Sequence, residues 1–134
     1  MATIKSSYEG NLRTKMIHLQ SGQEVITDAP LDNNGKGEAF SPTDTVAAAL
    51  GSCMVTIMGI VAERDGMSLL GLTWEITKVM QSEPRRISEI IVAFNWEKPV
   101  GNAAFLQKLK NAAKTCPVAL SLHPDIKQTV HFNF

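Results

Sequence analysis

The 134-residue sequence has little that points to a nucleic acid or a membrane. Its thirteen basic side chains balance thirteen acidic ones, and no Lys/Arg cluster offers the positive surface that nucleic acids and anionic membranes require. The first residues, MATIKSSYEGN, lack the apolar stretch of a signal peptide, and no apolar run approaches the roughly 18 residues of a membrane span. We therefore expect a soluble, cytoplasmic protein with neither of these partners.

Cysteine is also scarce, because the chain has only Cys53 and Cys116, too few for a disulfide scaffold. No Cys-x2-Cys or His-x3-His spacing occurs, which argues against a zinc site. A reducing cytosol would keep a merely structural pair open, so a disulfide between the two cysteines would be transient and functional. A Cys-His-Asp hydrolase built from Cys53, His123 and Asp125 stays open, although any chain of this size offers such a trio by chance.

The length and composition of the chain indicate one domain spanning residues 1–134. Apolar residues make up 44% of the chain, which is typical of a globular protein that buries its own core. Alternating runs predict three strands within residues 2–27, and residues 28–40, rich in turn formers, predict a loop. The expected buried face of these strands consists of Met16, Ile17, Leu19, Val25 and Ile26.

The clearest predicted element is a long helix between Ser41 and Gly66. Ser41-Pro42-Thr43-Asp44 combines a capping hydroxyl, a proline at the first helical position and an acid in the first turn. Apolar residues recur in this helix at a 3.6-residue period and so predict its buried face. That face consists of Val46, Ala49, Leu50, Cys53, Ile57, Ile60 and Val61.

The second half of the chain predicts a hairpin, two helices and a last strand. The hairpin pairs residues 69–81 with 86–96, a helix runs from Asn102 to near Thr115, and a short helix covers 118–122, before a strand at 126–134. The order is β-β-β-α-β-β-α-α-β. Because strands and helices occur in separate runs, we expect an α+β fold with helices packed on an antiparallel sheet.

The two cysteines differ in their predicted surroundings. Cys53 lies on the apolar helix face, where it is either a small buried hydrophobe or a nucleophile in an apolar pocket. Cys116 precedes Pro117 at a helix start, where unpaired backbone N–H groups favour a thiolate, unless it is merely a packed cap. Electrostatics alone makes Cys116 the more acidic thiol. A supporting cation must come from a lysine or an arginine, and spacing does not choose among the candidates Arg13, Lys15, Arg64, Arg85 and Arg86.

Two motifs together resemble the OsmC/Ohr family of peroxide-reducing proteins. They are SPTDTVAAALGSC at residues 41–53 and CPVALSL at 116–122, and the likeness extends over nearly the whole chain. The resemblance implies an OsmC-like fold and an intertwined homodimer with two active sites at the subunit interface. It implies a peroxidase for organic hydroperoxides or hydrogen peroxide that needs no metal, flavin or haem.

The resemblance also assigns roles to residues. Cys53 is implied to be the peroxidatic thiolate and Cys116 the resolving thiol, in the reverse of the electrostatic ranking, and Arg13 is implied to stabilise the Cys53 thiolate. An external thiol (a lipoyl-type dithiol, thioredoxin or a small thiol) would reduce the disulfide. The best-studied branches of the family carry a glutamate at the position of Thr43 to hold the arginine. Asp44 is the nearest acid, but it lies on the opposite side of the helix from Cys53 and is better suited to capping.

Two other function classes remain. A non-catalytic dimeric module could bind a small apolar ligand near Cys53, a reading that the absent glutamate favours. A thiol hydrolase or acyl carrier could use Cys53 alone.

Overall fold

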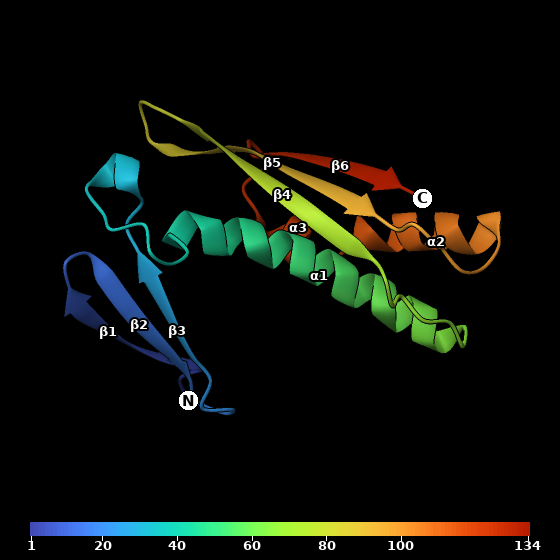
Figure 1. Ribbon diagram of the computed structural model, residues 1–134, viewed down its shortest axis with the longest axis horizontal. Coiled ribbons are helices and arrows are strands. Elements are labelled where there is room, and N and C mark those ends of the chain that lie inside the picture. The colour runs from blue at the N-terminus through green and yellow to red at the C-terminus, as the bar shows by residue number, and fades with distance from the viewer. The chain divides into compact units, whose positions relative to one another are not determined.

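The computed structural model describes residues 1–134, whose contacts group into two compact units, Met1–Val46 and Ala47–Phe134. The predicted α+β order is confirmed, with one additional 3-10 turn, η1 (Leu31–Asn33), inside the predicted loop (Figure 1). The strands form two three-stranded sheets, one in each unit, where the sequence predicted helices on a single antiparallel sheet.

The N-terminal unit contains an antiparallel sheet of β1 (Ile4–Gly10), β2 (Arg13–His18) and β3 (Glu24–Asp28). The β1–β2 turn passes through Asn11 and Leu12, both in the left-handed region at φ 54° and 62°. The buried face expected for these strands is wrong, because Leu19, Val25 and Ile26 are exposed. The residues that this unit does bury are polar: Thr27, Asp28 and Ser41.

The loop after β3 folds back onto the sheet. The backbone N–H of Ala29 donates to the Leu12 carbonyl at 3.1 Å, and that of Asp28 donates to the Phe40 carbonyl at 3.0 Å. Gly35 lies so close to Ala29 that an added Cβ would stand 1.7 Å from the Ala29 carbonyl oxygen. The loop is therefore anchored at both ends and requires glycine at its closest approach.

Helix α1 (Pro42–Arg64) begins where the sequence predicted. The Asp44 N–H donates to Ser41 Oγ at 3.1 Å, and the Ser41 N–H donates to Asp44 Oδ2 at 2.9 Å, so the two residues cap the helix reciprocally. The capping role expected of Asp44 is thus confirmed. Gly66, at φ 68°, lies in the left-handed turn that follows the helix.

The expected inward face of α1 is wrong in large part. Val46 and Ile60 are exposed, whereas the residues that are buried are Ala47, Leu50, Gly51, Met54, Met58 and Ala62. The helix is apolar around most of its circumference, so its sequence does not distinguish one face from another. The elements that pack on α1 determine which of its faces is buried.

Helix α1 also corrects the expectation that no segment could span a membrane. By length and composition alone it could cross one, since its most apolar stretch has a mean hydropathy of 2.0. Its buried face belongs, however, to the hydrophobic core of the C-terminal unit. A core helix of a soluble protein passes the same test.

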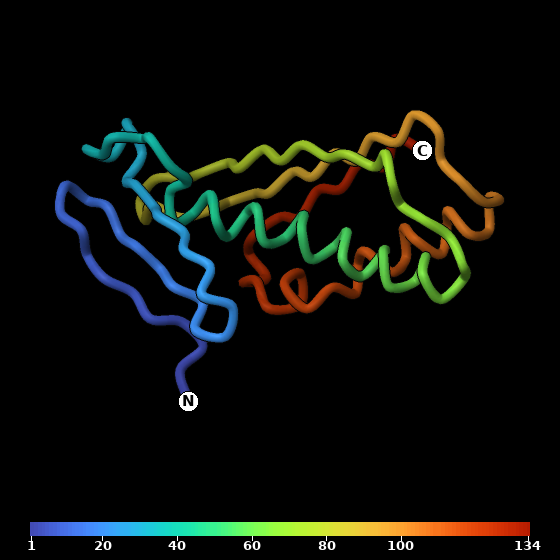
Figure 2. The backbone as a smooth tube through the Cα atoms, turned by 60° about the horizontal axis from the view of Figure 1, so that its bottom comes forward, coloured from blue at the N-terminus to red at the C-terminus, as the bar shows by residue number.

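The sheet of the C-terminal unit has the order β4 (Thr73–Gln81), β5 (Arg86–Asn95), β6 (Lys127–Asn133). β4 and β5 form the predicted hairpin, but β6 runs parallel to β5 and not antiparallel. Between β5 and β6 lie α2 (Ala103–Ala113) and α3 (Pro117–Ser121), a crossover that returns the chain to the end where β5 began. Figure 2 shows α1 and α2 on the same side of this sheet.

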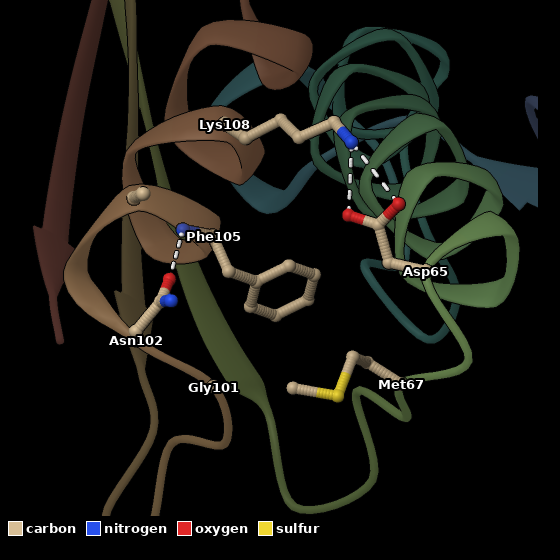
Figure 3. Close-up of a pocket in the computed structure, with 7 residues that line it drawn as sticks. Asp65, Met67, Gly101, Asn102, Phe105 and Lys108 are labelled. Atoms are coloured by element: carbon tan, nitrogen blue, oxygen red, sulfur yellow. Dashed lines mark hydrogen bonds and ion pairs between the residues drawn. The ribbon is translucent and has the colours of Figure 1, made fainter.

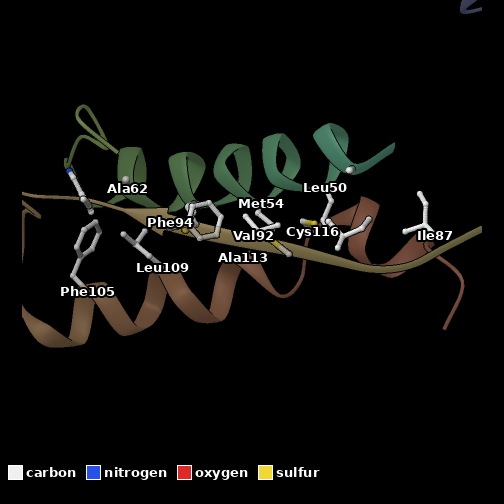
Figure 4. Close-up of a cluster of buried hydrophobic side chains, with 14 residues drawn as sticks. Leu50, Met54, Ala62, Ile87, Val92, Phe94, Phe105, Leu109, Ala113 and Cys116 are labelled. Atoms are coloured by element: carbon white, nitrogen blue, oxygen red, sulfur yellow. The ribbon is translucent and has the colours of Figure 1, made fainter. Parts of the chain in front are cut away.

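The hydrophobic core lies between the sheet and these helices (Figure 4). Alternate residues of β5, Ile90, Val92 and Phe94, are fully buried, as expected for one covered sheet face. Gly51 allows a close approach, because a Cβ there would lie 2.8 Å from Trp74 Nε1. The core extends to Cys116, which Figure 4 shows near Leu50 of α1.

Candidate functional site

Cys53 lies in the middle of α1, in a free and half-buried state. Its side chain packs against the core cluster without belonging to the fully buried set. The interpretation of Cys53 as an ordinary core residue therefore does not fit, because part of it reaches the surface. A partly exposed thiol can meet a substrate in solution.

Cys116 is fully buried at the start of α3. It is the N-cap residue ahead of Pro117, and its Sγ accepts a hydrogen bond from the Ala119 N–H at 3.3 Å, as the sequence predicted for a cap. Burial nevertheless raises the pKa of this thiol, and the N–H groups of Ala119 and Val118 oppose that rise only in part. The expectation that helix electrostatics would make Cys116 an acidic thiol is wrong, because desolvation has the larger effect.

The fold brings the two cysteines together. Cys53 lies beside the Cys116 thiol, and its proximity further raises the pKa of Cys116. They are far apart in sequence, so only the packing of α3 against α1 joins them. Two adjacent thiols with unequal exposure can form a disulfide after the more exposed one is oxidised.

Arg13 is held by two carboxylates of the N-terminal unit. Its Nε donates to Asp28 Oδ1 at 2.7 Å and its Nη2 to Asp28 Oδ2 at 2.8 Å, and Nη2 also contacts Glu38 Oε2 at 3.3 Å. The hydrogen bonds from Arg13 lower the pKa of the Asp28 carboxyl, and Asp28 in turn raises the pKa of Arg13. The sequence singled out Arg13 but missed Asp28 and Glu38.

Strand register was the signal that could have found Asp28. Arg13 begins β2 and Asp28 ends β3, and the two are direct partners across the antiparallel pair. Opposite charges at such paired positions stabilise a sheet. Glu38 gives no comparable signal, because it reaches Arg13 only through the fold of an irregular loop.

Thr43 provides no carboxylate at the start of α1. Its hydroxyl lies 3.3 Å from Ser41 Oγ, beside the helix cap. The absence of the expected glutamate does not leave Arg13 without an acidic partner, because Asp28 and Glu38 fill that role from the strand and the loop.

The His123–Asp125 pair lacks the geometry of a hydrolase triad. His123 Nδ1 accepts a hydrogen bond from the Asp125 backbone N–H at 3.0 Å, whereas the Asp125 carboxylate is 3.7 Å from the same nitrogen. A triad acid must instead accept a hydrogen bond from the imidazole. Both side chains are largely exposed, and Arg86 contacts the same Asp125 carboxylate at 3.8 Å.

A separate pocket of about 440 Å³ opens at the start of α2 (Figure 3). Met67 and Phe105 form its apolar wall, and Lys108 contacts Asp65 at 2.8 Å across one side. It contains neither cysteine. No group of three or more His, Cys, Asp or Glu side chains in the structure could hold a metal ion.

Comparison with known proteins gives consistent matches. The family model described as OsmC-like protein matches residues 35–131. A Psychrobacter arcticus protein described as an osmotic stress induced and detoxification response protein is 51% identical, with a TM-score of 0.94 and coverage of 99% of this chain and 96% of that one. Among curated proteins, none matches the chain.

Two more distant solved structures share the fold. An OsmC-like protein from Mycoplasma pneumoniae has 15% identity and a TM-score of 0.78, with coverage of 97% of this chain and 94% of that one. An organic hydroperoxide resistance protein OsmC from Legionella pneumophila has 16% identity and a TM-score of 0.71, with coverage of 100% and 98%.

Proposed function

The chain belongs to the OsmC-like protein family, and on that premise we propose that it is a thiol-dependent peroxidase for organic hydroperoxides or hydrogen peroxide. The observation that carries the proposal is the contact between a half-buried thiol, Cys53, and a buried one, Cys116. The name of the Legionella pneumophila relative, an organic hydroperoxide resistance protein, supports the same reaction class.

The proposed reaction has two steps on the protein. The Cys53 thiolate attacks one peroxide oxygen, so that an S–O bond forms as the O–O bond breaks, and the leaving oxygen departs as an alcohol or water after taking a proton. The Cys116 sulfur then attacks the Cys53 sulfenic acid, which forms the disulfide and releases water. Two electrons pass from the thiols to the peroxide.

Cys53 is the attacking thiol because it is the accessible one. Cys116 is fully buried and its pKa is raised, so it stays protonated and reacts only after a sulfenic acid has formed on Cys53 beside it. This order agrees with the roles that the family resemblance implies and opposes the ranking from helix electrostatics alone.

Arg13 is the proposed cation that stabilises the Cys53 thiolate and the leaving oxygen. An external thiol (a lipoyl-type dithiol, thioredoxin or a small thiol) would reduce the disulfide and complete the cycle. We further propose that the chain is a single OsmC-like domain that works in the cytoplasm as a homodimer. Large exposed apolar side chains, including Val46 and Ile60 on α1, support the dimer, since a partner subunit would cover them.

The alternative of a non-catalytic module loses its main support. That reading depended on an arginine left without a carboxylate, and Arg13 has two.

The test is a titration of the reduced protein with cumene hydroperoxide and, separately, hydrogen peroxide. One equivalent should consume both thiols and give an intramolecular Cys53–Cys116 disulfide, seen by peptide mapping. The Cys116→Ala variant should accumulate a Cys53 sulfenic acid that dimedone traps, and the Cys53→Ser variant should consume no peroxide. If both thiols of the natural protein stay free after excess peroxide, it is not a peroxidase of this kind.

A further inference from the structure

We propose that Gln128 is a positioning residue for Cys116, and that it thereby sets how fast a sulfenic acid on Cys53 is converted to a disulfide. This inference rests on the proposed function, in which the two cysteines react with each other. All three residues belong to the C-terminal unit, Ala47–Phe134.

Gln128 is a polar residue on the core-facing side of β6. It pairs with Ile90 of β5, which is fully buried, and Val130 and Phe132 follow it on the same face of the strand. The Gln128 side chain is half-buried. A polar group on a covered sheet face lowers stability unless it is hydrogen-bonded, so its presence among apolar neighbours points to a specific partner.

The partner of Gln128 is the backbone carbonyl of Ala119 in α3. Gln128 Nε2 donates to this oxygen at 2.9 Å. The last carbonyls of a helix have no partner within the helix, and the amide of Gln128 supplies one here. Ala119 also donates its own N–H to Cys116 Sγ at 3.3 Å. Through Ala119, two hydrogen bonds therefore connect β6 to the Cys116 sulfur.

The position of Cys116 depends on such contacts because α3 is short. It has five residues, none of them fully buried, and Leu120 is 74% exposed. Cys53, by contrast, lies in the 23-residue helix α1, which has a fully buried face. A disulfide requires the two sulfurs to come within about 2.05 Å of each other. Of the two thiols, Cys116 is thus the one whose placement a single hydrogen bond to α3 can change.

The experiment measures the two steps of the proposed reaction separately. Gln128→Met keeps the length of the side chain and removes the amide that donates to Ala119. We expect this variant to form the Cys53–Cys116 disulfide about tenfold more slowly or worse, because a small displacement of a reacting group costs at least that much. The first step, measured as dimedone-trapped Cys53 in the Cys116→Ala background, should keep its rate.

The slower second step should also appear as overoxidation. A sulfenic acid that survives longer meets a second peroxide and becomes a sulfinic acid. Mass spectrometry should therefore find about tenfold more sulfinic acid at Cys53 in Gln128→Met than in the natural protein at the same peroxide concentration. The matched control is Gln107→Met, which removes an amide that donates to Asn111 at 3.0 Å on α2 and should react like the natural protein.

Two results would overturn the proposal. One is equal overoxidation of Gln128→Met and the natural protein, and the other is an equal slowing of both steps, which indicates a general loss of structure. Should Gln128→Met fail to fold, Gln128→Glu decides the question. It has the same size but places an acceptor opposite the Ala119 carbonyl at neutral pH, so it should be overoxidised at least as much as we expect for Gln128→Met.

A second measurement keeps this inference separate from the peroxidase proposal. Glutathione disulfide oxidises the reduced protein to the Cys53–Cys116 disulfide and is itself reduced to two molecules of glutathione, with no peroxide present. The equilibrium constant reports how well the two thiols are placed for each other. Gln128→Met should lower it about tenfold even if the natural protein does not react with peroxides. Peroxide consumption by the natural protein, together with an unchanged constant and an unchanged rate of disulfide formation in Gln128→Met, would retain the peroxidase and reject the positioning role.

Discussion

The two units of the chain are each stabilised internally by a different kind of interaction. Every buried hydrophobic residue belongs to Ala47–Phe134, in a cluster that runs from Ala47 of α1 to Cys116. The buried residues of Met1–Val46 are Thr27, Asp28 and Ser41, each with hydrogen bonds or an ion pair. Packing defines one unit and directional polar contacts define the other.

This difference indicates which kinds of substitution each unit tolerates. An apolar core responds to volume, so deletions and additions of methyl groups should matter most in the C-terminal unit. A polar framework responds to charge and direction, so the N-terminal unit should respond to pH and salt. Large apolar side chains of this unit, such as Val25 and Ile26, are exposed.

The largest expected effect is truncation in the core. Leu109→Ala should lower the free energy of unfolding by about 2–5 kcal/mol, because Leu109 is fully buried and its removal leaves a cavity. Leu70→Ala, at a side chain that is 89% exposed, is the matched control and should change stability little. Urea unfolding measures both, and equal losses would mean that the cluster is not the main source of stability.

Two glycines of α1 should respond in opposite directions. Gly51→Ala should destabilise by about 1–3 kcal/mol, since its Cβ would lie 2.7 Å from Ile76 Cδ1 and 2.8 Å from Trp74 Nε1. Gly59→Ala meets nothing closer than Leu69 Cδ1 at 3.9 Å and should stabilise by up to about 1 kcal/mol through helix propensity. Thermal unfolding of the Gly51→Ala and Gly59→Ala variants tests the packing of α1 on β4. Melting temperatures that shift in the same direction for both variants would contradict that packing.

The N-terminal unit should reveal its polar framework through pH. The folded-state pKa of Asp28 is lowered by Arg13, so this carboxylate contributes stability above its unfolded pKa of 3.8 and loses it as pH falls through the folded value. Asp28→Asn should therefore melt below the natural protein at pH 7, with a difference that shrinks on acidification below about pH 4. A difference in melting temperature that is independent of pH would show that the pair contributes through shape and not charge.

The smallest expected effect is at a surface pair of the C-terminal unit. Lys108→Ala removes the contact with Asp65 at 2.8 Å, and since both groups meet solvent the loss should be about 0–1 kcal/mol. Urea unfolding at low and at high salt measures this loss. The difference in the free energy of unfolding between the natural protein and Lys108→Ala should become smaller as salt is added. A loss as large as that of Leu109→Ala would break the contrast between the units.

The sequence predicted the elements better than their packing. Ser41 and Asp44 act locally, so the start of α1 was predictable, as were Asn102, whose Oδ1 accepts the Phe105 N–H at 2.9 Å, and the Cys116–Pro117 cap. The buried face of α1 was not, because apolar residues surround it and only the sheet selects Met54 and Met58. The parallel pairing of β6 likewise depends on the crossover and not on the strand itself.

The candidate site divides in the same way. Cys53 and Cys116 could be named from the motifs, but their relative acidity could not, because it depends on the burial of Cys116, which no local pattern encodes. Arg13 could be suggested and its partners could not. Asp28 requires the strand register and Glu38 requires the loop to fold back, and both are long-range consequences of the fold.

The contact between Cys53 and Cys116 has a consequence for thermal behaviour. A bond between them would close a ring of about 63 residues, which contains β4, β5 and α2, and such a ring would raise the free energy of unfolding by about 4 kcal/mol through lost entropy of the unfolded chain. The oxidised protein should then melt at a higher temperature and resist proteases longer than the reduced one. A melting curve would thus record the recent exposure of a sample to oxidant.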